Sequence, residues 1–422
     1  MGNTAVIGLQ WGDESKGKLV DVLSESHDVV VRYNGGGNAG HTIVVDGVTH
    51  KLHHIPSGII RGKLCVMGNG MVVHSGILDE ICNLEDKGIR VEPDNLAISP
   101  RAHVTLKHQK ALDGVIGRKV GAKGIGTTLR GIGPTYADKI YRTGIRFCDF
   151  LDLSDRGLEA KVNDNVGLAN HVLDYYVASR VDVGEVLDEL LGMREKLSPF
   201  VRRSVLGIIE KHDGGLLFEG GQGTLLGIDE GTFPFCTSSN PSRLGIYSGI
   251  GTYVDIPNVV GVLKAYNTRV GEGPFPTELF DEIGKRLGIR GKEIGTTTGR
   301  NRRCGCLDLF AADYSSRINR VDEIFLPKLD VLDEEPYISI CTGYLLDGER
   351  VENFESVISI LDRVKPVYET IDGWRQDTTN ARTVGDLPRN ARLYIERIEN
   401  YLQKPIKRVG IGPERGEVVD LQ

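Results

Sequence analysis

The residues GLQWGDESKGKLVD occupy positions 8–21 of the chain. A short apolar run at residues 5–9 is typical of a buried strand, and the spacing of residues 16–25 predicts the start of a helix. A glycine-rich turn between a strand and a helix exposes backbone N–H groups at the positive end of the helix dipole. The stretch therefore predicts a phosphate-binding cradle in an α/β fold.

The cradle matches most of the P-loop pattern, but one residue departs from it. The spacing Gly12-x4-Gly17-Lys18 is present, whereas Leu19 stands where a Ser or Thr would hold Mg²⁺. Asp13 lies inside the loop, and a carboxylate among phosphate-binding amides is costly unless a cation bridges it or it performs proton chemistry. Asp13 is therefore a candidate metal ligand and proton acceptor. The alternative is a glycine-rich turn with a solvated Asp-Glu pair.

The composition is that of an ordinary globular protein. The 422 residues could form two or three domains on length alone, with 40% hydrophobic and 26% charged residues. The net charge of −7 argues against nucleic acid as the main partner. No stretch approaches the roughly 20 apolar residues of a membrane span, and no signal peptide is evident. Seven scattered cysteines without zinc-ligand spacing indicate reduced thiols, so we expect a cytoplasmic protein without a membrane partner.

A second glycine-rich loop follows an expected strand at residues 28–33. It reads NGGGNAGHT at residues 34–42, and an expected hairpin comes directly after it. His41 is the most distinctive of the ten histidines because it ends this loop. The alternative for His41 is a loop imidazole that bonds a nearby carbonyl.

The remaining pattern gives the fold class. Apolar runs and helical spacing predict strands at residues 64–67, 216–219, 259–266, 323–329 and 408–411, and helices at residues 76–87 and 101–112. The predicted fold is α/β, with a P-loop-like, mostly parallel central sheet flanked by helices, an all-α subdomain and small β-hairpin excursions.

The scarcity of glycine in one segment of the chain indicates the domain organisation. Residues 152–212 have helical spacing and little glycine, which indicates the all-α subdomain. We expect a single domain over residues 1–422, with a helix-rich subdomain at residues 100–212 inserted in the α/β core. A hairpin is expected at residues 345–351, with its turn at Asp347-Gly348.

Two later loops have the residues of anion and base sites. Residues 295–303 combine Gly and Thr with Arg300, Arg302 and Arg303, and arginine forks suit carboxylates and phosphates. Lys328-x-Asp330 follows an expected strand. A carboxylate there could accept the two N–H groups of a guanine edge while the lysine stem covers the ring. The alternative for residues 295–303 is a solvated basic turn.

Taken together, these loops resemble the adenylosuccinate synthetase family. The resemblance extends from Val6 to Arg415, and its motifs occur in family order: WGDE (11–14), GG (35–36), NAGHT (38–42), GTT (126–128), RGIGP (130–134), FEG (218–220), QGTLL (222–226), TSSN (237–240), TTGR (297–300) and KLDVLD (328–333). The resemblance implies a GTP- and Mg²⁺-dependent ligase, homodimeric, that joins L-aspartate to IMP in AMP synthesis.

The resemblance also implies the site residues. The catalytic residues would be Asp13, His41 and Gln222, and the metal ligands Asp13 and the carbonyl of Gly40. GTP would contact Gly12, Asp13, Glu14, Ser15, Lys16, Gly17, Lys18, Gly40, His41, Thr42, Arg302, Lys328, Leu329, Asp330, Gly410, Ile411 and Gly412. IMP would contact Asp13, Asn38, Ala39, Gly40, His41, Thr128, Gln222, Thr237 and Arg300, with Arg142 supplied by the other subunit. Aspartate would contact Thr296, Thr297, Thr298, Gly299, Arg300 and Arg302.

The chain departs from the family pattern near the substrates. Ser15 and Leu129 replace glycines, Gly37 replaces the common histidine, Asn301 replaces an arginine, and PSRLG stands at residues 241–245. These departures motivate two alternatives to the IMP ligase. One is the same chemistry on another purine monophosphate such as dGMP, and the other is a GTP-binding switch protein without ligase activity.

Overall fold

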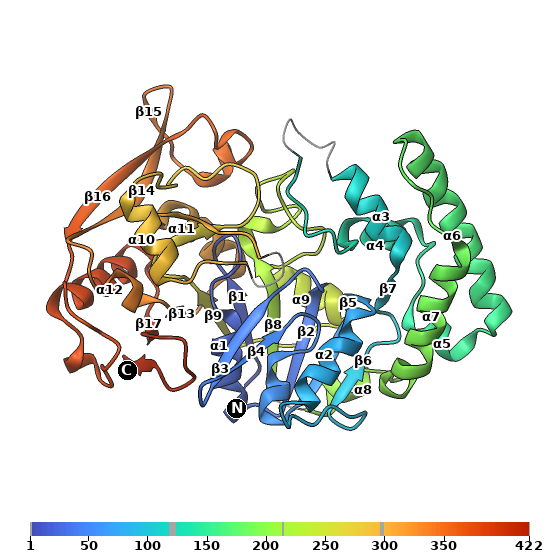
Figure 1. The fold of residues 1–422 in the computed structure, drawn as a ribbon. Coiled ribbons are helices and arrows are strands. Elements are labelled where there is room, and N and C mark those ends of the chain that lie inside the picture. Colours follow the sequence, from blue (N-terminus) through green and yellow to red (C-terminus); the bar gives the residue numbers. More distant parts are fainter. Residues whose placement is uncertain (1, 118–123, 213–214, 296–298, 422) are drawn as a thin grey trace.

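The computed structural model describes residues 2–117, 124–212, 215–295 and 299–421. Within these residues the chain forms a ten-stranded sheet with strand order β18-β17-β13-β9-β1-β8-β2-β5-β6, and β7 also pairs with β5 (Figure 1). The pairs are parallel except β17 with β18. The strands are β1 (Thr4–Gly8), β2 (Val29–Gly36), β5 (Leu64–His74), β6 (Leu96–Ile98), β7 (His103–Thr105), β8 (Leu216–Gly223), β9 (Asn258–Val262), β13 (Glu323–Leu326), β17 (Ile406–Gly410) and β18 (Val418–Asp420).

The sheet has a hydrophobic core on each face. In β2, Val29 and Val31 pack into one core cluster, whereas Val30 packs into the other. Successive side chains of a strand point to opposite faces, so a strand covered on both faces is a continuous apolar run. This explains why the valine run of β2 was recognisable in the sequence.

Helices cover both faces of the sheet. Leu19 and Val20 of α1 pack into the core that contains Val30, while Ile246 and Ile250 of α9 pack into the opposite one. The helices outside the helical subdomain are α1 (Lys16–Leu23), α2 (Gly76–Glu85), α9 (Arg243–Ile250), α10 (Glu282–Arg290), α11 (Leu309–Asn319) and α12 (Arg389–Leu402). Short 3-10 helices are η1 (Ser24–Ser26), η2 (Ser57–Arg61), η3 (Ser198–Phe200), η4 (Thr224–Leu226), η5 (Leu329–Leu332), η6 (Phe354–Ile360) and η7 (Val384–Asp386).

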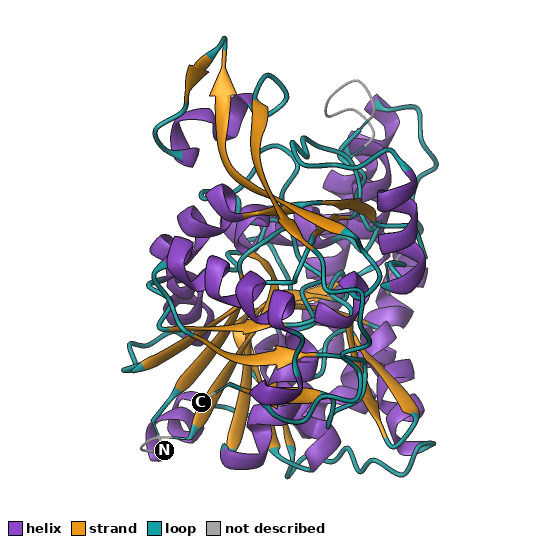
Figure 2. Cartoon of the chain, turned by 90° about the vertical axis from the view of Figure 1, so that its left-hand side faces the viewer, coloured by secondary structure: helices purple, strands orange, loops and turns teal. Residues whose placement is uncertain are grey.

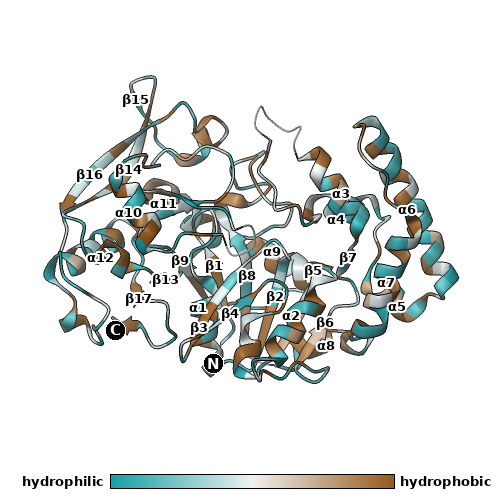
Figure 3. Ribbon diagram, in the orientation of Figure 1, coloured by the Kyte–Doolittle hydropathy of each residue, from teal (hydrophilic) through white to brown (hydrophobic). Residues whose placement is uncertain are grey.

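A group of helices lies at one end of the sheet, on the right of Figure 1. It consists of α3 (Lys107–Ile116), α4 (Ile132–Tyr141), α5 (Phe147–Asp152), α6 (Asp155–Tyr175), α7 (Val183–Leu197) and α8 (Leu206–Lys211). Ser154 and Asp182 cap the N-termini of α6 and α7 by accepting backbone N–H groups. Figure 3 shows hydrophobic and hydrophilic residues on the same helices of this group, and the hydrophobic ones of α5, α6 and α7 supply its core.

The prediction of a helix at residues 101–112 is wrong in its first half. Residues 103–105 form β7, which pairs with Val72–His74 at the end of β5, and the helix begins only at Lys107. The pairing with β5 overrides the local helical spacing of residues 101–112. Other expected strands differ only in length, since β2 and β5 run on into Gly36 and His74.

Smaller sheets and hairpins project from the core. The expected hairpins are confirmed as β3 (His41–Val45) with β4 (Val48–Leu52), and β14 (Tyr337–Leu346) with β15 (Glu349–Arg350). Figure 2 shows the long β14 hairpin rising away from the central sheet. Strands β16 (Lys365–Asp372) and β12 (Leu307–Asp308) pair with β14, and β10 (Asn267–Arg269) pairs with β11 (Arg303–Gly305). No helix in the described part of the chain is long and apolar enough to cross a membrane.

Candidate active site

A cleft of about 1030 Å³ lies where the carboxyl ends of β1, β2 and β8 open into loops. This edge of a parallel sheet is where α/β proteins bind their ligands. The cleft brings together the two glycine-rich loops and the Lys-x-Asp segment. Its walls include residues from 11–18, 38–42, 125–128, 235–238, 290–302 and 327–331.

The first loop owes its shape to residues in left-handed conformations. Gly12, Asp13 and Ser15 have φ values of 83°, 59° and 68°. The buried carboxylate of Glu14 accepts the backbone N–H groups of Gln10 at 3.1 Å and Gly12 at 2.9 Å. Gly17 permits a close approach, because a Cβ there would lie 2.8 Å from the Cβ of His41. Glu14 therefore holds the loop from inside, and Gly17 lets the second loop pack on α1.

Two lysines follow in the first turn of α1. Lys16 pairs with Glu14, and Lys18 donates from Nζ to the carbonyls of Gly412 at 2.7 Å and Glu417 at 2.8 Å. Burial lowers the pKa of Lys18 to about 8. Lys18 thus fastens the C-terminal loop to the phosphate cradle.

Asp13 faces an arginine across the cleft. Its Oδ1 lies 2.9 Å from Nη2 of Arg302, and its side chain is 24% exposed. Nη1 of Arg302 also donates to Oε2 of Glu293 at 2.7 Å. Burial lowers the pKa of the Arg302 guanidinium, but Asp13 and Glu293 together raise this pKa above its ordinary value. The carboxylate of Asp13 is therefore held in place and remains accessible from the cleft.

His41 forms a buried pair with the carboxylate of Glu219. Its Nδ1 bonds Oε1 of Glu219, and Glu219 also accepts the backbone N–H and the hydroxyl of Ser57, each at 2.7 Å. Burial lowers the pKa of His41, while Glu219 opposes this shift. Nε2 of His41 has no protein hydrogen-bond partner within the described ranges. The carboxylate fixes the ring and leaves Nε2 as its remaining hydrogen-bonding atom.

Polar side chains next to this pair form a network around Gln222. The Oε1 of Gln222 accepts from Asn34 Nδ2 and Ser239 Oγ, each at 3.2 Å, and its Nε2 donates to Asn38 Oδ1 at 3.2 Å. Asn38 Nδ2 in turn lies 3.5 Å from Thr237 Oγ1. The arrangement offers amides and hydroxyls that suit the edge of a purine or a phosphate.

Two further loops meet over the cleft. Arg300 donates from Nη2 to the carbonyl of Gly126 at 2.8 Å. The loop of Gly126 is held by Asp113, which accepts from Thr127 Oγ1 at 2.8 Å and from the N–H of Gly131 at 2.9 Å. Leu129 has a φ of 57° and is 50% exposed, so this family glycine position keeps its left-handed conformation with a leucine.

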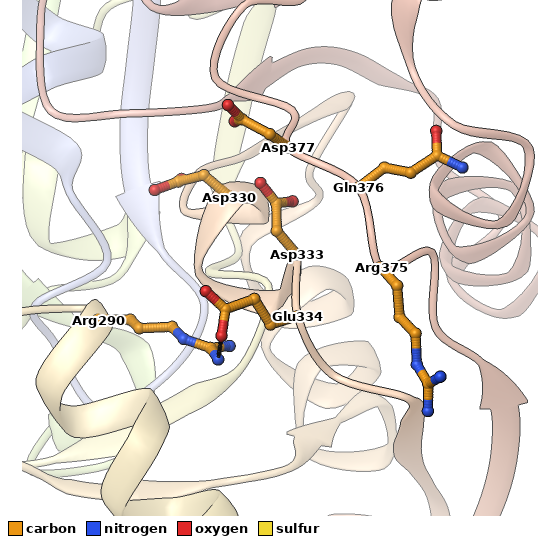
Figure 4. Close-up of a pocket in the computed structure, with 7 residues that line it drawn as sticks. All are labelled: Arg290, Asp330, Asp333, Glu334, Arg375, Gln376 and Asp377. Carbon is orange, nitrogen blue, oxygen red and sulfur yellow. Dashed lines mark hydrogen bonds and ion pairs between the residues drawn. The ribbon is translucent and has the colours of Figure 1, made fainter.

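The Lys-x-Asp segment lines another part of the cleft. Lys328 donates from Nζ to Oε1 of Glu293 at 2.8 Å. Oδ1 of Asp330 is buried and lacks a protein partner among the described residues, and burial raises the pKa of this carboxyl to about 6. Asp330 and Arg290 also border an adjoining hollow of about 470 Å³, in which Figure 4 shows Arg290 joined to Glu334. The hollow is completed by Asp333, Arg375, Gln376 and Asp377.

Most site residues expected from the sequence line this one cleft. They are Gly12, Asp13, Glu14, Ser15, Lys16, Gly17, Lys18, Asn38, Ala39, Gly40, His41, Thr42, Thr128, Gln222, Thr237, Gly299, Arg300, Arg302, Lys328, Asp330 and Gly412. Leu329, Gly410 and Ile411 are buried and are not part of its lining. Arg142 is exposed at the C-terminus of α4, away from the cleft of its own chain. Thr296, Thr297 and Thr298 lie outside the described residues.

Sequence reasoning missed Glu219, Ser57, Glu293 and Lys264. Glu219 had a usable signal, because a carboxylate inside the apolar run of β8 needs a buried partner. Lys264 had the same signal, because it lies inside the apolar run at residues 259–266, whereas Glu293, which pairs with it at 3.2 Å, has none.

A cleft of this construction, at the carboxyl edge of a parallel sheet, defines a nucleotide-dependent enzyme with a P-loop-like α/β fold. The family model described as adenylosuccinate synthetase matches residues 5–419. The chain belongs to the adenylosuccinate synthetase family.

Relatives and solved structures support this membership over the full length. Adenylosuccinate synthetase of Streptomyces coelicolor is 47% identical and covers 99% of this chain and 98% of its own. The adenylosuccinate synthetase of Heliobacterium modesticaldum is 45% identical, and the match covers 100% of this chain and 99% of that protein. The fully ligated enzyme of Plasmodium falciparum superposes with a TM-score of 0.91 at 37% identity and covers 99% of each chain. A cyanophage S-2L succinoaminodeoxyadenylate synthetase, at 19% identity and a TM-score of 0.60, shares the fold alone.

These relatives decide between the hypotheses raised by the sequence. The chain is a GTP-dependent ligase of purine biosynthesis that joins L-aspartate to IMP. The comparisons favour this activity over a dGMP acceptor and over a switch protein without ligase chemistry.

Proposed function

We propose that Asp13 and His41 are the catalytic residues of this ligase and that Gln222 assists them. The observation that carries the proposal is that Asp13 sits inside the phosphate cradle, while His41 is fixed beside the same cradle by Glu219. An oxygen on a purine is a poor leaving group, so the reaction needs one group to activate it and another to stabilise phosphoryl transfer. The two residues supply these functions from adjacent loops.

The reaction proceeds in two displacements. Asp13 accepts the N1 proton of IMP, so that O6 attacks the γ-phosphorus of GTP and the bond from that phosphorus to GDP breaks. His41 presents Nε2 to the donor phosphates as charge moves onto GDP. The neutral amine of aspartate then attacks C6 and releases a proton to the solvent, and the bond from C6 to O6 breaks so that O6 leaves as part of inorganic phosphate. Gln222 hydrogen-bonds the purine during both displacements.

Mg²⁺ fits the donors that the cleft offers. Magnesium is commonly bound by one or two carboxylates together with substrate phosphates. Asp13 is the accessible carboxylate of the loop, since Glu14 is buried and already accepts two backbone N–H groups. Asp13 and the carbonyl of Gly40 would hold the ion, which would neutralise charge on the phosphates.

The cleft divides among three substrates. IMP contacts Asn38, Gln222 and Thr237 in the wall built around Gln222, and Thr128 and Arg300 in the two loops that meet over the cleft. GTP extends from the cradle to Lys328 and Asp330, where the unpartnered Oδ1 of Asp330 suits the N–H edge of guanine. Aspartate lies by the loop of Gly299, where arginine forks would meet its carboxylates.

The enzyme acts as a homodimer in this proposal. Arg142 cannot serve the cleft of its own chain from the exposed end of α4, so it reaches the IMP site of a partner. Ile140 and Tyr141 beside it are 76% and 74% exposed, and such apolar residues suit an interface. The seven free cysteines support a cytoplasmic location.

A substrate-omission assay tests the proposal. The protein with IMP, GTP, Mg²⁺ and aspartate should form adenylosuccinate, GDP and phosphate, and omission of any one component should stop the reaction. Asp13→Ala and His41→Asn should each abolish turnover in a folded protein. Near-normal rates in either variant would contradict the assigned roles.

A further inference from the structure

Glu293 is a buried carboxylate on which cations from three parts of the chain converge. Its side chain is fully buried, and its oxygens accept from Lys328 Nζ at 2.8 Å, Arg302 Nη1 at 2.7 Å and Lys264 Nζ at 3.2 Å. The hydroxyl of Tyr266 also donates to it. Although burial alone would raise the pKa of Glu293, the three cations hold it well below its ordinary value.

The partners of Glu293 belong to different segments that line the cleft or lie behind it. Lys328 begins the Lys-x-Asp segment, and Arg302 contacts Asp13 in the phosphate cradle at 2.9 Å. Lys264 is itself fully buried and also donates to Thr268 Oγ1 at 2.5 Å, which anchors the group to the core behind the cleft.

Glu293 also stands at the base of the loop that carries Arg300. Its backbone carbonyl accepts the N–H of Arg302 at 2.9 Å, and the N–H of Gly295 bonds the carbonyl of Arg300 at 2.8 Å. Side chain and backbone of Glu293 therefore both fix Arg302. Lys328 and Arg302 share the single carboxylate of Glu293. A change in the hydrogen bond to one of them therefore alters the hydrogen bond to the other.

We infer that Glu293 is a positioning residue that couples the guanine end of the cleft to its aspartate end. The inference rests on the proposed function, which places GTP at Lys328 and aspartate by the loop of Gly299, where Arg302 is one of the arginine forks. Glu293 touches no substrate. It holds the lysine stem under the base and turns the arginine fork toward the amino acid.

The test measures the KM of each substrate for the Glu293→Gln variant. Glutamine keeps the shape of the side chain and removes the charge that Lys328, Arg302 and Lys264 share. We expect the KM of GTP and the KM of aspartate each to rise roughly 10- to 100-fold, the effect of losing a charge-assisted hydrogen bond. The KM of IMP should rise less than either of these. Equal changes in all three KM values, or a loss in kcat alone, would overturn the inference.

Asp308→Asn is the matched control. Asp308 is also a buried carboxylate, which caps α11 through the N–H of Ala311 and bonds Tyr344, and it does not line the cleft. We expect this variant to lose thermal stability and to keep all three KM values. If it reproduced the pattern of Glu293→Gln, that pattern would reflect lost stability, and the coupling would be refuted.

Two more variants separate the inference from the proposed function. Lys328→Gln should raise the KM of GTP, and an unchanged value would refute the proposed donor site whatever Glu293 does. If Lys328→Gln behaves as expected but Glu293→Gln leaves the KM of aspartate unchanged, only the coupling fails. If Glu293→Gln does not fold, the double variant of Glu293→Gln with Lys264→Gln removes both charges of the buried ion pair. The inference requires that the KM of GTP and the KM of aspartate also rise in this double variant.

Discussion

Replacing Glu219 with glutamine removes the charge that orients His41 and leaves the volume of the side chain unchanged. Glu219 is completely buried on β8 and accepts three hydrogen bonds, one from His41 and two from Ser57. A glutamine has one acceptor oxygen and one donor NH₂ group. At least one of the three donors would then face another donor.

The structure sets the size of the effect. An unsatisfied buried donor costs about 1–3 kcal/mol, so Glu219→Gln should lose stability in that range. The loss in rate should be larger, because a histidine in the wrong orientation no longer serves the phosphates. General acid–base contributions of about 10²- to 10⁴-fold set the expected fall in kcat. The KM of aspartate should not change, since its proposed residues lie on other loops.

Steady-state kinetics and urea denaturation measure both quantities, with Glu80→Gln as the control. Glu80 is a buried carboxylate of similar construction, which accepts the N–H groups of His53, His54 and Ile55 and bonds Nδ1 of His54. It does not line the cleft. Glu80→Gln should lower stability and leave kcat nearly intact. If Glu219→Gln lost no more activity than Glu80→Gln, the orienting role of Glu219 would be refuted.

Three further predictions concern Asp330, Ser15 and Gly37. Burial raises the pKa of Asp330 to about 6, so its carboxylate becomes protonated as the pH falls through 6 and the KM of GTP should rise. A KM that stays constant between about pH 5 and pH 7 would contradict this role. Ser15→Gly should raise the free energy of unfolding in urea by about 1 kcal/mol, because Ser15 has a φ of 68°; a decrease would show that its conformation is not strained. Gly37→Ala would place a Cβ 2.0 Å from Nε2 of His74 and should lower that free energy by about 1–3 kcal/mol. Because His74 Nδ1 also accepts the N–H of Gly76, the test is a double-mutant cycle: Gly37→Ala should cost less in a His74→Ala background than in the unaltered protein, and an equal cost would show that His74 is not the clashing residue.

The fold was largely predictable because its signals are local. The cradle, the glycine-rich loops and the hairpin turn at Asp347-Gly348 each have a short sequence pattern with a physical reason. The strand at His103–Thr105 was missed because its evidence is not local. It exists through pairing with residues of β5 some 31 positions earlier, as in His103 with Val72.

Much of the lining of the cleft was predictable for the same reason. Asp13 and His41 stand in glycine-rich loops, where their side chains have few structural reasons to occur. Glu293 could not be assigned in this way, because its side-chain partners Lys264 and Lys328 lie 29 and 35 residues away. The left-handed φ of Leu129 shows a further limit, since a leucine gives no sign of the conformation that a glycine would have indicated.

The central claim is that O6 of IMP is phosphorylated after Asp13 removes the N1 proton, and that this oxygen then leaves as phosphate. IMP labelled with ¹⁸O at O6 tests it directly by mass spectrometry of the phosphate released with GTP, Mg²⁺ and aspartate. We predict one ¹⁸O atom in each phosphate formed by the unaltered protein and no labelled phosphate from Asp13→Asn. Unlabelled phosphate from the unaltered protein, or full transfer of label by the variant, would contradict the account.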